Sequence, residues 1–212
     1  EGARDFGAEV VFEGTTSLHR KVRAEAMAAE EGLTIVPPFD HRRIIAGQGT
    51  VGLEIVQDWP EVEAVLVPIG GGGLAAGTAA AVKAALPRTR VLGVEARGAP
   101  SMRAALDAGQ PVTLDHIETI ADGLAPVRSG DLTFLHGRSL LDDVVLVDDD
   151  AIRSAAGLLL SRRKLVVEFS GAASLAALLS GAAGVEGRNV AVVLSGGNLD
   201  PSLFGELTGV SG

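Results

Sequence analysis

The sequence contains no cysteine. This absence excludes disulfides, thiolate catalysis and cysteine-ligated metal sites, so any bound metal would need oxygen or histidine ligands. No apolar run reaches the roughly 20 residues of a membrane-spanning helix, and no secretory leader is recognisable. The sequence therefore predicts a soluble protein with no membrane partner, for which the cytoplasm is the default setting.

Basic residues are also scarce. Lysine and arginine total 18 against 27 aspartate and glutamate residues, which gives a formal charge of −9. A broad interface with a phosphate backbone needs a basic face, so nucleic acid is not expected as a partner. The lysines are Lys21, Lys83 and Lys164. The histidines lack the spacing of a metal site, being dispersed at His19, His41, His116 and His136.

Short β-branched runs alternate with longer segments rich in alanine, leucine, arginine and glutamate. Strands are expected over 9–12, 33–36, 64–69, 90–95, 144–147 and 190–195. Helices are expected over 16–31, 47–57, 74–86, 99–108, 149–164 and 172–179, with loop and short helix over 109–138. This order predicts an α/β fold with an open, mostly parallel, twisted sheet and helices on both faces. No domain boundary is marked.

The most specific motif is a glycine run after an apolar strand. Residues 64–69 (AVLVPI) precede Gly70, Gly71, Gly72 and Gly73, and a helix is expected to start at Leu74. Consecutive glycines let backbone N–H groups converge, and the helix N-terminus adds unpaired amides and its positive dipole end. The motif predicts a site for a phosphate group.

The kind of phosphate is not settled by the glycines alone. Gly71, Gly73 and Ala76 fit the dinucleotide pattern G-x-G-x-x-[GA], and Glu95 ends the next strand, where it could accept a ribose hydroxyl. An NAD-binding Rossmann oxidoreductase is therefore a rival hypothesis. No lysine followed by serine or threonine follows the glycines, which argues against a nucleoside-triphosphate loop.

A second glycine cluster follows the last expected strand, in the order Ser195-Gly196-Gly197-Asn198. A parallel sheet places it at the same carboxyl edge as the first glycine run. The Ser195 hydroxyl could donate a hydrogen bond to a heteroaromatic nitrogen there. Together, the two clusters favour a cofactor with a phosphate at one end and a ring at the other.

Five strings in order resemble the serine/threonine dehydratase and serine racemase family, whose members are fold-type-II pyridoxal-phosphate enzymes of amino-acid metabolism. The strings are IAGQGT (45–50), PIGGGGL (68–74), GVE (93–95), ETIADG (118–123) and LSGGN (194–198). The resemblance runs from about Gly7 to Asp200. It implies a fold like that of the tryptophan synthase β subunit.

The resemblance also implies a cofactor and a reaction. Pyridoxal 5′-phosphate would be held through its phosphate by Gly70–Gly73 and the amide of Leu74, and through its pyridine nitrogen by Ser195. The family reaction converts L-threonine or L-serine to a 2-oxo acid and ammonia. A homodimer with a small amino-acid substrate is the family expectation. The segment 37–40 (PPFD) is closer to the dehydratase form than to the racemase form.

Some family members also bind a divalent cation. The resemblance maps its ligands to the Glu95 carboxylate, the Ala99 carbonyl and a third position that is Ser101 here. Loss of one anionic ligand weakens a Mg²⁺ or Ca²⁺ site. The alternative is that Glu95 accepts only local hydrogen bonds.

The family's Schiff-base lysine lies in a Ser-Phe-Lys motif upstream of the matched strings, and that motif does not occur in this sequence. No catalytic residue is therefore assigned. We expect residues 1–212 to be the larger part of a catalytic domain that lacks its upstream portion and has no C-terminal regulatory domain. Serine racemase, hydroxyaspartate ammonia-lyase and a non-catalytic module of the same fold remain alternatives.

Overall fold

The computed structural model describes residues 2–185 and 188–208, which divide into two compact units. The first unit, Glu1–Val36, contains α1 (Gly2–Asp5) and α2 (Ser17–Glu31). None of the residues of these two helices is buried. The second unit, Pro37–Gly212, begins at a pair of prolines. This boundary was not predicted from the sequence, although the proline pair Pro37–Pro38 marks it.

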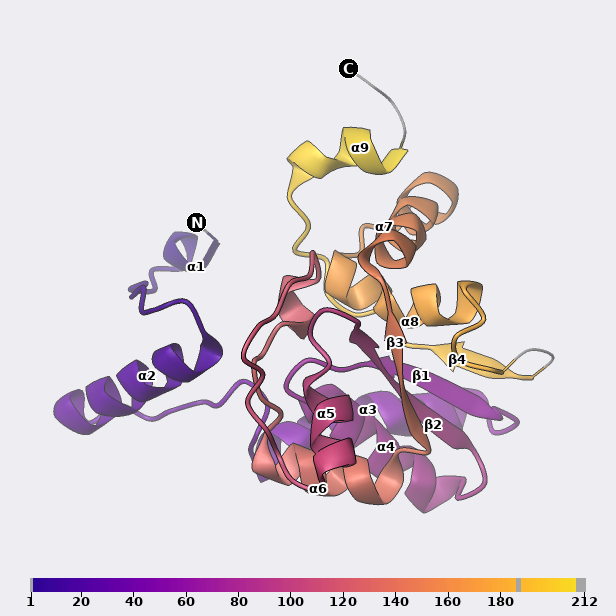
Figure 1. The fold of residues 1–212 in the computed structure, drawn as a ribbon, viewed down its shortest axis with the longest axis horizontal. Coiled ribbons are helices and arrows are strands. Elements are labelled where there is room, and N and C mark those ends of the chain that lie inside the picture. Colours follow the sequence, from indigo (N-terminus) through magenta and orange to yellow (C-terminus); the bar gives the residue numbers. More distant parts are fainter. Residues whose placement is uncertain (1, 186–187, 209–212) are drawn as a thin grey trace. The chain divides into compact units, whose positions relative to one another are not determined.

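The second unit contains a four-stranded parallel sheet in the order β3-β2-β1-β4 (Figure 1). The strands are β1 (Ala64–Pro68), β2 (Arg90–Ala96), β3 (Asp143–Val147) and β4 (Val190–Val192). The principal helices are α3 (Arg42–Asp58), α4 (Gly73–Ala85), α5 (Ser101–Ala108), α6 (Asp131–Leu140), α7 (Asp149–Leu158), α8 (Phe169–Leu179) and α9 (Phe204–Thr208). Shorter turns of helix are η1 (Asp122–Leu124), η2 (Leu159–Arg163) and η3 (Pro201–Leu203).

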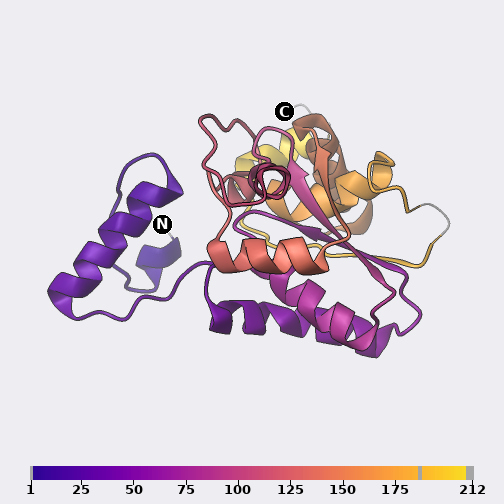
Figure 2. The ribbon, with the colours of Figure 1, turned by 60° about the horizontal axis from the view of Figure 1, so that its bottom comes forward.

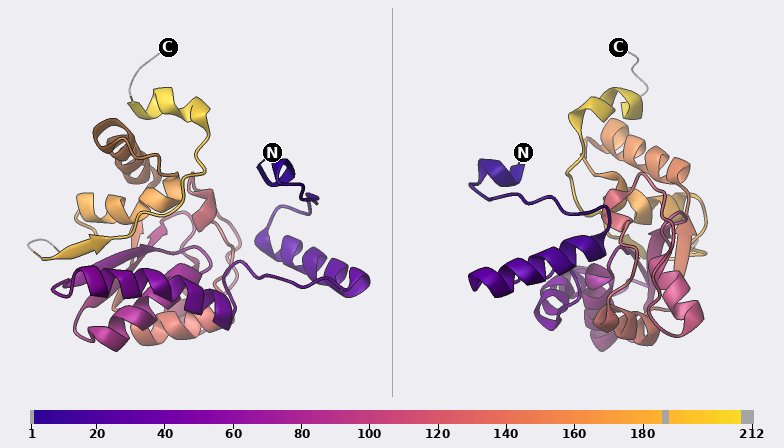
Figure 3. Two further views of the ribbon diagram at one scale, coloured as in Figure 1. Left: turned by 180° about the vertical axis from the view of Figure 1, so that it is seen from behind. Right: turned by 60° about the vertical axis from the view of Figure 1, so that its left-hand side comes forward.

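Alternate residues of β1 pack into two separate cores. Ala64 and Leu66 face one cluster with α7 and α8, whereas Val65 and Val67 face another with α4, α5 and α6. Figures 2 and 3 show helices above and below the sheet within this unit. Because both faces are covered, all five residues of β1 are buried, as expected for a central parallel strand. The predicted fold class is confirmed.

Two predicted strands are wrong. Residues 9–12 and 33–36 are not strands in the structure. A strand requires a neighbouring strand for its backbone hydrogen bonds, and neither segment pairs with a strand among the described residues. Most of their apolar side chains are exposed, with Phe12 at 82% and Val36 at 77%. β-branched composition alone therefore overestimated the strand content.

Helix boundaries follow their capping residues. Asp148 caps α7 by accepting the backbone N–H of Ala151 at 2.8 Å, which confirms the helix start predicted at residue 149. The helical stretch continues through η2 and ends at Lys164, which has a positive φ of 60°. None of the helices within residues 2–185 and 188–208 combines the length and apolar character needed to cross a bilayer.

Candidate cofactor site

The two glycine clusters lie at one edge of the sheet. β1 and β4 are adjacent and parallel, and the pairing continues where the Val193 N–H donates to the Leu66 carbonyl at 3.0 Å. Gly70–Gly73 leave the carboxyl end of β1, and Ser195 follows β4 in the same direction. The structure therefore brings together the two loops that the sequence predicted to share an edge.

The first loop presents backbone donors that lack acceptors. Gly72 has φ 93° and ψ −2°, a left-handed conformation that glycine adopts without a Cβ clash, and it directly precedes α4. Gly71, Gly72 and Gly73 are buried. No described residue accepts a hydrogen bond from the backbone N–H of any residue from Gly70 to Leu74. Buried amides at a helix start require an acceptor, and an anionic group would satisfy them.

A second glycine-containing segment packs against this loop. A side chain on Gly70 would collide with the Gly123 carbonyl, so the η1 turn lies directly beside the loop. The Gly123 N–H in turn donates to the Ser170 hydroxyl at 2.8 Å. Ser170 is in the first turn of α8. The ETIADG string is thus part of the same site, at the start of α8.

The loop that contains Ser195 also contacts the start of α8. A side chain on Gly171 would collide with the Ser195 carbonyl oxygen. The Glu168 carboxylate accepts the Asn198 N–H at 3.0 Å, and the Glu168 N–H donates to the Gly196 carbonyl at 3.2 Å. No described residue forms a hydrogen bond with the Ser195 hydroxyl, which leaves it available to a ligand.

Glu168 is a site residue that the sequence analysis missed. A Cβ on Gly123 would lie 3.4 Å from its Oε1, and a side chain on Gly196 would collide with the same carboxylate. Glu168 therefore lies between the η1 turn and the loop of Ser195. Its one local signal was a charged residue ending the apolar run 165–167, just before α8.

Neither lysine of the second unit lies in this cluster. Lys83 donates to the Asp142 carboxylate at 2.8 Å and to the Thr89 carbonyl at 2.9 Å. Both partners precede strands, so Lys83 is at the amino edge of the sheet, opposite the glycine loop. Lys164 is exposed and donates to the Ser161 carbonyl. Lys21 is an exposed residue of the first unit, and its Nζ lies 3.8 Å from Oε1 of Glu25.

Glu95 is fully buried, and its carboxylate accepts hydrogen bonds from neighbouring residues. It accepts the N–H groups of Met102 at 2.7 Å and Arg103 at 2.9 Å and the Ser101 hydroxyl at 3.4 Å. These bonds leave Glu95 poorly placed to bind a ribose, which removes the acidic residue that the dinucleotide hypothesis needs. Its role as a metal ligand with Ala99 stays a prediction, and no group of three potential ligand side chains occurs among the described residues.

The buried Glu95 predicts a pH-dependent stability. Burial raises its pKa from 4.5 to about 7 despite the three opposing hydrogen bonds. The pKa of Glu95 is higher in the folded state than in the unfolded state, so its protonated form stabilises the fold. This contribution to the free energy of unfolding is fully present below pH 4.5 and is lost as pH rises through about 7. The free energy of unfolding should thus fall by about 3 kcal/mol across this window.

Urea unfolding at several pH values measures this effect. Glu95→Gln, which cannot ionise, should lose this decline, whereas Glu54→Gln on an exposed face of α3 should keep it. Parallel pH profiles for the natural chain and Glu95→Gln would show that Glu95 does not titrate in this range.

A family model described as "Pyridoxal-phosphate dependent enzyme" matches residues 1–196. The catabolic L-threonine dehydratase of Escherichia coli K12 is 42% identical over 207 residues, covering 97% of this chain and 63% of that protein. The L-threonine ammonia-lyase of Thermotoga maritima is 40% identical over 201 residues, covering 95% of this chain and 50% of that protein. This chain thus spans between half and two thirds of the length of these curated relatives.

Solved structures of other proteins also superpose on this chain. Maize serine racemase superposes with a TM-score of 0.87 at 36% identity, covering 96% of this chain and 63% of that one. The processed form of threonine deaminase isoform 2 from Solanum lycopersicum has a TM-score of 0.89 at 35% identity, covering 98% of this chain and 58% of that one.

Proposed function

Because this chain belongs to the pyridoxal-phosphate dependent enzyme family, we propose that it carries the cofactor site of an ammonia-lyase acting on L-threonine, L-serine or both. The observation that carries the proposal is the set of amides without acceptors from Gly70 to Leu74, of which those of Gly71, Gly72 and Gly73 belong to buried residues. They fit a phosphate group, and the Ser195 hydroxyl fits a ring nitrogen at the same edge of the sheet.

The protein residues would bind and orient the cofactor. The amides of Gly70–Gly73 and Leu74 would hold its phosphate as multiple, charge-assisted donors. Ser195 would donate one neutral hydrogen bond to the ring nitrogen, without the strong drive to protonate it that a carboxylate provides. The bound cofactor would supply the electron sink for loss of the Cα proton. Elimination tolerates a weaker electron sink, since the departing β-hydroxyl carries away charge.

The net reaction would convert L-threonine to 2-oxobutanoate and ammonia, or L-serine to pyruvate and ammonia. The substrate loses its Cα proton and its β-hydroxyl as water, and that water is regained when the resulting enamine tautomerises to an imine and is hydrolysed. Similarity to the dehydratases of Escherichia coli and Thermotoga maritima supports this choice. Similarity to maize serine racemase supports racemisation of serine as a second candidate.

The lysine that links the cofactor covalently would lie outside this sequence. Lys83 is engaged at the opposite edge of the sheet, and Lys21 and Lys164 are exposed with local partners. Residues 1–212 would then be the larger part of a catalytic domain, and this range includes residues 1, 186–187 and 209–212, which the structure does not describe.

The homodimer remains part of the proposal, and sedimentation equilibrium tests it. The cytoplasmic setting also stays a prediction.

Incubation of the natural protein with pyridoxal 5′-phosphate and each substrate tests the activity. We expect one equivalent of ammonia for each 2-oxo acid from L-threonine or L-serine, with little D-serine. Rapid formation of D-serine without 2-oxo acid would favour the racemase. Tight binding of NADH together with no binding of pyridoxal 5′-phosphate would contradict both candidates.

A further inference from the structure

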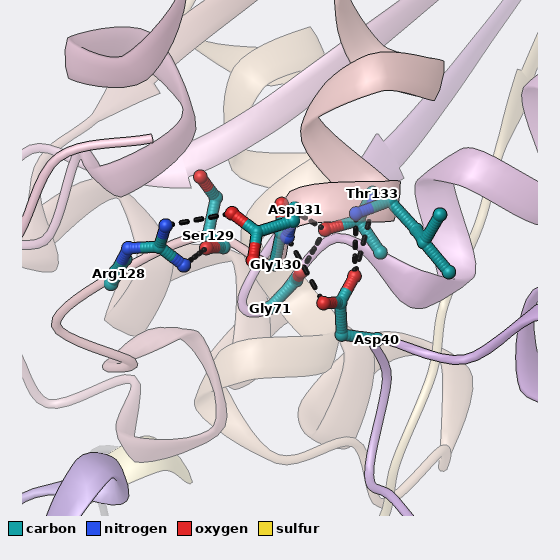
Figure 4. Close-up of polar contacts among 8 residues, drawn as sticks. Asp40, Gly71, Arg128, Ser129, Gly130, Asp131 and Thr133 are labelled. Carbon is teal, nitrogen blue, oxygen red and sulfur yellow. Dashed lines mark hydrogen bonds and ion pairs between the residues drawn. The ribbon is translucent and has the colours of Figure 1, made fainter. Parts of the chain in front are cut away.

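The carbonyl group of Gly71, in the middle of the glycine loop, is held by α6. The Thr133 hydroxyl donates to it at 2.7 Å, and the Gly130 N–H donates more weakly at 3.4 Å. Thr133 is completely buried in the first turn of α6. Figure 4 shows the Thr133 side chain directed at Gly71. One oxygen of the loop therefore has a fixed direction set by a side chain far away in the sequence.

Fixing this oxygen also fixes an amide. In a planar trans peptide unit, the C=O of one residue and the N–H of the next point in opposite directions. Because the Gly71 oxygen is held on the side of α6, the Gly72 N–H must point away from α6. That N–H is one of the buried donors without an acceptor. Thr133 thus determines where one of the candidate phosphate donors is aimed.

The first turn of α6 is itself held by Asp40. Its carboxylate accepts the N–H groups of Asp131 at 3.0 Å, Leu132 at 2.9 Å and Thr133 at 3.2 Å (Figure 4). A side chain on Gly130 would collide with Asp40, so the close approach depends on that glycine. A negative charge at a helix N-terminus is also favourable. Asp40 therefore keeps the Thr133 backbone in place.

We propose that Thr133 is a positioning residue for the cofactor phosphate and that Asp40 acts by holding Thr133. Thr133 does not contact the phosphate; it orients the peptide unit between Gly71 and Gly72 so that the Gly72 N–H faces the bound anion. This inference rests on the proposed function, because it assumes that the glycine loop binds the phosphate of pyridoxal 5′-phosphate.

A comparison of pyridoxal 5′-phosphate with pyridoxal isolates the phosphate interaction. Both ligands share the ring, so the ratio of their dissociation constants on the natural protein reports on the phosphate alone. Thr133→Val keeps the side-chain shape and removes the donor, and we expect this preference to fall about tenfold or more. Thr133→Ser restores the hydroxyl and should keep the preference within about twofold. Affinity for pyridoxal should hardly change.

Thr89 provides a matched control at the amino edge of the sheet. It is also a buried threonine whose hydroxyl donates to a backbone carbonyl, that of Val62, at 2.8 Å. Thr89→Val should lower stability to a similar degree and leave the preference for the phosphorylated ligand unchanged. Asp40→Asn provides a second variant that does not alter Thr133, and we expect a smaller loss of preference in the same direction.

The outcomes are separable. A natural protein that binds pyridoxal 5′-phosphate no better than pyridoxal would overturn both the phosphate site and this inference. A natural protein with a strong preference that persists in Thr133→Val, or in Asp40→Asn if the valine variant does not fold, would overturn only the positioning role. Equal losses in Thr133→Val and Thr89→Val would also overturn it, because the effect would then follow general stability.

Discussion

Replacing Gly72 with alanine should weaken the binding of pyridoxal 5′-phosphate about a hundredfold, since the displaced loop would lose about two charge-assisted hydrogen bonds. At φ 93° an alanine is strained, and its Cβ would lie 2.8 Å from the Thr133 Cβ. The loop would have to change conformation, and its converging amides would separate. Equilibrium titration of the natural protein and the variant measures the change.

Gly109 supplies the control for backbone strain. It has φ 71° at the C-terminal cap of α5, and no heavy atom lies within 4 Å of a Cβ built there. Gly109→Ala should therefore cost about 1 kcal/mol of stability and leave cofactor binding unchanged. If Gly72→Ala bound the cofactor as tightly as Gly109→Ala, the glycine loop would not be the phosphate site.

Replacing Gly171 with alanine should destabilise the chain by about 3 kcal/mol, because a side chain there is forced against the Ser195 carbonyl. Inside a helix, this substitution ordinarily stabilises by up to about 1 kcal/mol. The expected sign is therefore reversed. The loop of Ser195 must also move, so affinity for the ring of the cofactor should fall. Chemical denaturation and ligand titration measure the two effects.

Gly47 in α3 is the matched helical glycine, since a Cβ there meets no heavy atom within 4 Å. Gly47→Ala should stabilise the chain by up to about 1 kcal/mol, in accord with helix propensity. Should Gly171→Ala prove as stabilising as Gly47→Ala, the close contact between α8 and the loop of Ser195 would be refuted.

Local patterns in the sequence were enough to predict the sheet and its two glycine loops. The apolar run 64–69 identifies a central strand because it is buried on both faces, and the four glycines that follow mark a turn before a helix. Parallel pairing then places the loop of Ser195 at the same edge. Each step depends only on neighbouring residues and on the general geometry of parallel sheets.

Features that depend on distant residues were not predicted. The helix α6 begins within residues 109–138, which were expected to be loop and short helix without assigned bounds, and its first turn is held by Asp40, about 90 residues earlier in the chain. Glu168 enters the site through a hydrogen bond to Asn198, 30 residues later. At residues 33–36 the error is the reverse, because a strand was predicted there and none forms. A segment of strand-like composition becomes a strand only where a neighbouring strand is available.

Reduction of the natural protein with borohydride in the presence of pyridoxal 5′-phosphate, followed by peptide mapping by mass spectrometry, tests the central claim most directly. Borohydride converts the link between a lysine and the cofactor to a stable adduct. We predict one reduced cofactor per chain, attached to a lysine other than Lys21, Lys83 and Lys164. No adduct, or an adduct on one of these three lysines, would contradict the account.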